Sequence, residues 1–238
     1  MPWIGWAMRQ RDNGWRGKEM NIAILFEAAG NAGIGAGALL AGKELFCYSL
    51  KAFYLHPRID AIVLALPGSE RTEQVKRRIT GWKTECGIEK PVWIGRGISD
   101  LRHIGTGRRG DLETVGKADL YALHDIRYPF VTADMIYGVM EKAALYGCAV
   151  TAGKVEEGLF LAAGQEALEE GRLRCVKYPA ALRSMDGKFH ILEDLDGMLG
   201  RCVRHKAYLC DAAQGNPFVC TWEGLEMAES MVRARAAL

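Results

Sequence analysis

Short apolar runs alternate along this chain with longer segments in which apolar residues recur at helical spacing. Apolar runs of about four to eight residues, bounded by turn residues, are typical of strands buried on both faces. This pattern predicts strands over residues 21–26, 61–66, 91–95, 118–123 and 149–152. Helical spacing predicts helices over residues 43–55, 72–82, 132–146 and 225–237, with a short helix over 111–116. The alternation favours an α/β fold, a mostly parallel mixed sheet of about seven strands with helices on both faces.

Residues 154–218 alternate less cleanly and contain the turn pairs Asp186-Gly187 and Asp196-Gly197. We expect this segment to extend the sheet and to project an arm somewhere within residues 154–211. No linker rich in Pro or Ser divides the chain, so residues 20–238 are expected to form a single domain.

The first nineteen residues differ from the rest of the chain. They hold three of the six Trp residues and show no periodicity. The four residues before Met20, Arg-Gly-Lys-Glu, can be encoded by a purine-rich run like that of a ribosome-binding site. No apolar stretch of ~7 to 15 residues precedes a small-residue cleavage site, so a signal peptide is not expected. Residues 1–19 are therefore interpreted as a non-native or disordered extension.

Composition narrows the classes of function. The chain is 49% hydrophobic and 25% charged, as in ordinary soluble globular proteins. Four of its 31 basic and two of its 29 acidic residues precede Met20, so the remaining charges cancel, which does not favour nucleic acid as a partner. No apolar run approaches the ~18 to 20 residues of a membrane span. Seven scattered cysteines without a CxxC pair indicate a reducing cytoplasm.

The strongest chemical signals lie where two predicted strands end. Residues 21–26 open onto a glycine-rich loop, residues 28–37, whose N–H groups could cradle phosphates. Residues 118–123 are followed by His124 and Asp125. A carboxylate at a strand end lies where open α/β sheets bind ligands, and it suits Mg²⁺. Together they predict a nucleotide site. The alternatives are a loop that is only a flexible connection, and an Asp125 that pairs with Arg127 or caps the next helix.

These segments follow one another in the order of a known family. In the glycine loop, in residues 40–53, 124–131 and 178–183, and in a closing segment with Asn216 and Thr221, the chain resembles the 2-C-methyl-D-erythritol 4-phosphate cytidylyltransferases and the related ribitol-phosphate cytidylyltransferases. The resemblance covers nearly everything from Met20 to Leu238.

The resemblance implies a Rossmann-like fold of the nucleotidyltransferase type and a role in making isoprenoid precursors. It also implies CTP and an alditol phosphate as substrates, pyrophosphate as a product, a homodimer, and Mg²⁺ held by Asp125. The nucleotide contacts that it implies are Ala28, Ala29, Gly30, Asn31, Gly33, Gly35 and Gly107.

The chain departs from the family pattern where cations should meet the phosphates. The loop Arg of the family falls on Ile34 or its neighbours and its closing Lys on Phe218, and no basic residue lies between Met20 and Lys43. Removing one electrostatic stabiliser of a charged transition state typically costs ~10² to 10³ in rate. Arginines elsewhere are predicted to stabilise the phosphates instead: Arg102, Arg108, Arg109 and Arg127.

Three hypotheses therefore stay open. The first is a cytidylyltransferase that has rebuilt its phosphate site from relocated arginines. The second is a catalytically inactive homologue that acts as a binding or regulatory protein. The third is a related transferase for another nucleotide or sugar phosphate.

Overall fold

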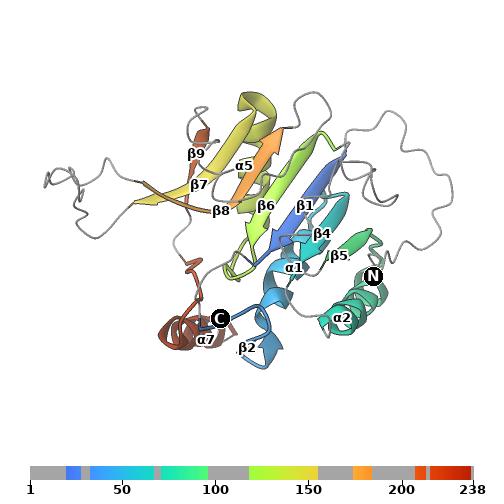
Figure 1. Cartoon of the computed structure of the whole chain (residues 1–238), viewed down its shortest axis with the longest axis vertical. Coiled ribbons are helices and arrows are strands. Elements are labelled where there is room, and N and C mark those ends of the chain that lie inside the picture. Colours follow the sequence, from blue (N-terminus) through green and yellow to red (C-terminus); the bar gives the residue numbers. More distant parts are fainter. Residues whose placement is uncertain are drawn as a thin grey trace, which may run out of the picture.

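The computed structural model describes residues 20–27, 33–66, 71–95, 118–154, 174–183, 207–212 and 215–236. The N-terminal extension and the short helix predicted over 111–116 lie outside these ranges. Within them, a seven-stranded sheet has the order β5-β4-β1-β6-β8-β7-β9 (Figure 1). Its strands are β1 (Asn21–Phe26), β4 (Ala61–Ala65), β5 (Val92–Gly95), β6 (Leu120–Asp125), β7 (Cys148–Lys154), β8 (Arg174–Arg183) and β9 (Tyr208–Asp211).

Only β8 runs against its neighbours. It pairs antiparallel with β6 and β7, whereas the other strand pairs of the sheet are parallel. The predicted mostly parallel, mixed sheet is therefore confirmed. Strands β8 and β9 come from the segment that was expected to extend it. In the described part of the chain, no helix is long and apolar enough to cross a membrane.

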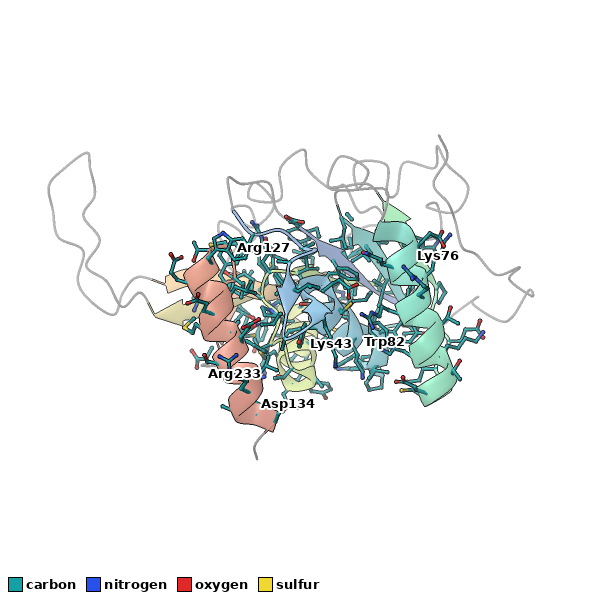
Figure 2. All side chains as sticks on the ribbon, turned by 90° about the horizontal axis from the view of Figure 1, so that it is seen from below. Lys43, Lys76, Trp82, Arg127, Asp134 and Arg233 are labelled. Atoms are coloured by element: carbon teal, nitrogen blue, oxygen red, sulfur yellow. The ribbon has the colours of Figure 1, made fainter. Side chains whose placement is uncertain are left out.

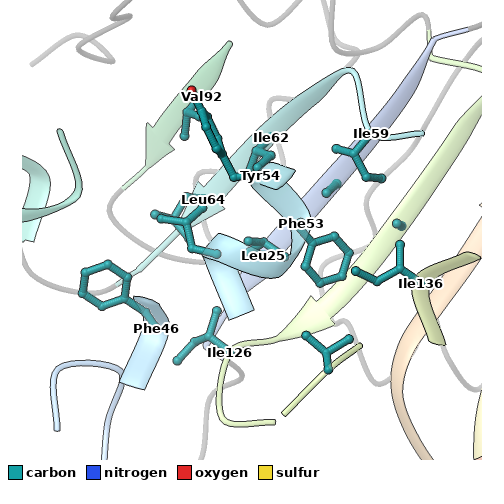
Figure 3. Packing of buried hydrophobic residues seen from close by; sticks show 14 of the residues in the cluster. Leu25, Phe46, Phe53, Tyr54, Ile59, Ile62, Leu64, Val92, Ile126 and Ile136 are labelled. Carbon is teal, nitrogen blue, oxygen red and sulfur yellow. The ribbon is translucent and has the colours of Figure 1, made fainter. Parts of the chain in front are cut away.

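Three helices pack on one face of the sheet: α1 (Leu45–Leu55), α2 (Arg71–Cys86) and α5 (Ala133–Tyr146). Successive residues of a strand point to opposite faces, so alternate residues such as Leu25 and Leu64 supply this core. Phe53 of α1 and Ile136 of α5 belong to the same cluster (Figure 3). The opposite set, with Ile24, forms a second buried cluster in which no described helix takes part.

Two element boundaries differ from the prediction in ways that affect the site. Strand β6 ends at Asp125 rather than at residue 123, because its pairing with β1 continues to the partners Phe26 and Asp125. The helix predicted from residue 43 begins at Leu45, because β3 (Lys43–Glu44) turns back on β2 (Leu39–Leu40).

The last helix, α7 (Trp222–Ala236), lies beyond the arrowheads of β1 and β6 (Figure 1). It starts three residues before the predicted position, and the Thr221 hydroxyl caps it by accepting the Gly224 N–H at 3.1 Å. A third buried cluster joins α7 to the glycine loop and to the segment after β6: Ile34, Leu40, Leu45, Phe130, Val219, Leu225 and Ala228. The helix thus borders the carboxyl edge of the sheet.

Candidate functional site

The carboxyl ends of β1 and β6 meet at one point of the sheet edge. Phe26 and Asp125 are register partners, and the Ile126 N–H donates to the Phe26 carbonyl at 2.9 Å. Glu27 follows β1 directly, so its carboxylate and that of Asp125 start from neighbouring strands. The glycine loop and the segment after β6 both leave from here, at the edge where open α/β sheets bind ligands.

Asp125 is paired with Arg127. Its Oδ1 accepts the Arg127 Nε–H at 3.0 Å and the Arg127 backbone N–H at 3.0 Å, and its Oδ2 accepts Nη2–H at 2.7 Å. The two side chains are only 2% and 5% exposed. Burial alone would lower the pKa of Arg127, but the hydrogen bonds and charge of Asp125, with the charge of Glu27, raise it above its ordinary value. The guanidinium therefore stays charged inside the protein.

Phe218 covers the guanidinium of Arg127. Its ring centroid lies 4.6 Å from the Arg127 Cζ, and 5.0 Å from the ring of Tyr128. The Val219 N–H donates to the Arg127 carbonyl at 2.9 Å, which ties the two segments together. Figure 2 looks onto this end of the molecule and shows Arg127 at the start of α7, with Lys43 apart from it. Phe218, which is aligned with the closing Lys of the family, thus supplies no charge. Its ring instead helps to hold the charged guanidinium of Arg127 in place.

In the described part of the glycine loop, Ile34, Gly35 and Ala36 contact other groups of the protein. Ile34, aligned with the loop Arg of the family, is 1% exposed and packs in the third cluster. The Ala36 N–H donates to Glu27 Oε2 at 3.1 Å, and a Cβ on Gly35 would lie 2.9 Å from Glu27 Oε1. Gly35 therefore leaves room for the Glu27 carboxylate. Glu27 was not predicted, although an acidic residue directly after a buried strand was a signal for it.

His124 points into the core and not toward a ligand. Its Nε2 lies 3.1 Å from both the Ser49 Oγ of α1 and the Tyr128 carbonyl, and its ring centroid is 5.1 Å from that of Phe53. Its Nδ1 is buried without a hydrogen-bond partner among the described residues. Burial lowers the pKa of His124 to about 4. Protonation would place a second N–H at Nδ1, where no described group accepts it.

The buried imidazole makes stability depend on pH. In the unfolded chain the pKa of His124 returns to about 6.5, so between about pH 6.5 and about pH 4 the unfolded state binds more protons. We expect the free energy of unfolding to fall on acidification by up to about 1.4 kcal/mol per pH unit in this window. Urea unfolding at several pH values measures the slope.

His56 is also buried with a lowered pKa, so it contributes to the slope in the same direction. The variant His124→Gln therefore serves as the control, because it removes only the contribution of His124. The variant should lose part of the dependence. An unchanged slope in His124→Gln would contradict the assignment.

Other predicted site residues have structural contacts or lie outside the described ranges. Asn216 accepts the Phe130 N–H at 2.9 Å through Oδ1, and Thr221 caps α7. Lys43 is exposed on β3. The predicted contacts that lie outside the described residues are Ala28, Ala29, Gly30, Asn31, Arg102, Gly107, Arg108 and Arg109.

The oxygen ligands around Asp125 do not fit a Mg²⁺ ion as they are arranged. Both oxygens of Asp125 accept hydrogen bonds from Arg127, and the Glu27 carboxylate accepts one from the Ala36 N–H. A dication at Asp125 would need oxygens that a guanidinium now holds. Among the described residues, no three His, Cys, Asp or Glu side chains are grouped to hold a metal. This arrangement does not support the Mg²⁺ site that the resemblance implies at Asp125, which no observation tests directly.

Several known proteins similar to this chain are named as cytidylyltransferases. The chain matches no protein-family model. It is 24% identical over 238 residues to the 2-C-methyl-D-erythritol 4-phosphate cytidylyltransferase of Lysinibacillus sphaericus, covering 91% of this chain and 98% of that protein. It is 26% identical over 157 residues to the ribitol-5-phosphate cytidylyltransferase of Lacticaseibacillus paracasei, covering 64% and 63%.

Solved structures confirm the fold. The 4-diphosphocytidyl-2C-methyl-D-erythritol synthase of Anaerococcus prevotii superposes with a TM-score of 0.65 at 13% identity, over 90% of this chain and 99% of that one. The 2-C-methyl-D-erythritol 4-phosphate cytidylyltransferase of Thermus thermophilus gives 0.59 at 19% identity, over 91% and 100%. The sheet order and these matches define an α/β fold of the nucleotidyltransferase type. As the motifs predicted, the chain is similar to proteins named 2-C-methyl-D-erythritol 4-phosphate cytidylyltransferase and ribitol-5-phosphate cytidylyltransferase, at 24% and 26% identity.

Proposed function

We propose that this protein binds CTP at the carboxyl edge of β1 and β6 and transfers its cytidylyl group to an alditol phosphate. 2-C-methyl-D-erythritol 4-phosphate is the first candidate acceptor, because most of the curated relatives are named for it. The observation that carries the proposal is the meeting of the glycine loop with the buried Asp125–Arg127 pair at this edge. The homodimer, the arm within residues 154–211 and the cytoplasmic location stay predictions.

The proposed reaction needs positive charge at the α-phosphate. An oxygen of the acceptor phosphate attacks the α-phosphorus, and the bond from that phosphorus to the bridging oxygen breaks, releasing pyrophosphate. A fixed cation stabilises this transition state without reorganising. The hydrogen bonds to Asp125 use two of the five N–H donors of the Arg127 guanidinium, so donors remain for phosphate oxygens. We assign this role to Arg127, with Arg108 and Arg109 as further predicted contributors.

Release of pyrophosphate from CTP tests the proposal. We expect release with CTP, Mg²⁺ and 2-C-methyl-D-erythritol 4-phosphate, and none when the acceptor is omitted. Isothermal titration calorimetry with CTP serves as the second measurement, because binding without release would leave two explanations, another acceptor phosphate or a protein that binds CTP without turning it over.

Two observations favour the alternative, an inactive homologue that acts as a binding or regulatory protein. The charge of Arg127 is already balanced by Asp125, and Ile34 and Phe218 stand where the family has cations. If these experiments show no pyrophosphate release and no CTP binding, that result would favour the alternative.

A further inference from the structure

Two carboxylates at neighbouring strand ends are a donor set that Mg²⁺ can share with nucleotide phosphates. Here Glu27 follows β1 and Asp125 ends β6, whose last residue is the register partner of Phe26. In this chain each carboxylate has a protein donor instead: the Ala36 N–H for Glu27 and the Arg127 guanidinium for Asp125. The acidic residues are present, but both oxygens of Asp125 and Oε2 of Glu27 already accept hydrogen bonds from the protein.

The guanidinium of Arg127 is held on several sides. Nε and Nη2 bond Asp125 at 3.0 and 2.7 Å, and the Phe218 ring lies 4.6 Å from Cζ. The Arg127 backbone is fixed as well, through its N–H to Asp125 and its carbonyl to the Val219 N–H. The residue is 4% exposed. To leave Asp125, this side chain would have to break two charge-assisted hydrogen bonds and a cation–π contact together.

A dication would have to compete with that arrangement. Placed against Asp125, it would meet a positive charge bonded to the same two oxygens, and like charges at such short range repel strongly in a buried site. Displacing Arg127 would leave a guanidinium without its counter-ion. Both routes disfavour metal binding at this carboxylate.

We propose that Arg127 occupies the cation position beside Asp125, so that this carboxylate recruits no divalent metal ion and the phosphates of a bound nucleotide meet a guanidinium there. The inference rests on the proposed function for the identity of the nucleotide. The absence of a divalent metal ion at Asp125 is inferred from the Asp125–Arg127 geometry alone.

Mn²⁺ is the probe, because it replaces Mg²⁺ at oxygen sites and is paramagnetic. In the wild-type protein, the amide NMR signals of Asp125, Ile126 and Arg127 should keep their intensity as Mn²⁺ is added. Arg127→Gln removes the competing positive charge from the carboxylate, and we expect it to tighten Mn²⁺ binding by at least about tenfold. Arg127→Gln combined with Asp125→Asn should lose that gain.

Selective broadening of the Asp125 signals in the wild type would overturn the inference. So would a folded Arg127→Gln variant without tighter Mn²⁺ binding, because something other than Arg127 would then keep metal away. If that variant does not fold, as its circular dichroism would show, the wild-type spectra still decide. A failure of CTP to bind would count against the proposed function but would leave the Mn²⁺ result unaffected.

Discussion

Replacing Asp125 by Asn is expected to lower the free energy of unfolding by about 3 to 5 kcal/mol, as removal of one partner of a buried ion pair does. The carboxylate is 2% exposed and accepts two guanidinium hydrogen bonds and one backbone hydrogen bond from Arg127. Asn can accept only on its carbonyl side. Its amide group would then face guanidinium donors, and the charge of Arg127 would be buried without a counter-ion. Urea unfolding of the variant measures the loss.

Two further variants make this stability test specific. Asp125→Asn combined with Arg127→Met should cost less than Asp125→Asn alone, because no charge is then left unpaired. Glu89→Gln is the matched control, since it breaks an exposed pair of similar length, Lys83 Nζ to Glu89 Oε1 at 2.7 Å. Exposed pairs contribute about 0 to 1 kcal/mol. A loss in Asp125→Asn no larger than in Glu89→Gln would show that the buried pair is not what holds this edge.

Much of the sheet could be predicted because its central strands carry continuous apolar runs. β1 and β4 are buried along nearly their whole length, and such runs bounded by turns leave little choice of structure. β8 and β9 were expected only as an unspecified extension. β8 contains Pro179, which argues against a strand away from an edge, and the side chains of β9 are mostly exposed. Their pairing depends on partners distant in the sequence.

The position of the candidate site followed from the sequence, but its internal pairing did not. Asp125 was placed at the correct edge, whereas its pairing with Arg127 remained one of several alternatives. That pairing depends on a turn in which the Tyr128 N–H donates to the Asp125 carbonyl at 3.1 Å. Ile34 illustrates the same limit, because it is buried by residues such as Leu225, far along the chain.

Replacing Arg127 by Met is expected to reduce kcat for pyrophosphate release from CTP by about 10² to 10³, if the protein turns over as proposed. Arg127 is the buried cation at the carboxyl edge in the part of the chain that the structure describes. Because negative charge on the phosphate oxygens shifts during the transfer, a fixed guanidinium should act on kcat more than on KM. Steady-state kinetics at a temperature where the variant is folded measures both.

Arg58→Met is the matched control for this experiment. Arg58 also places its guanidinium over an aromatic ring, 4.8 Å from the centroid of Tyr137, but it precedes β4, at the opposite edge of the sheet. Its loss should leave kcat nearly unchanged. Equal activity of Arg127→Met and the wild type would remove Arg127 from the phosphate site and assign the required charge to other residues, with Arg108 and Arg109 the first to replace. A fall in both variants would indicate a general loss of folded protein, which the urea midpoints would reveal.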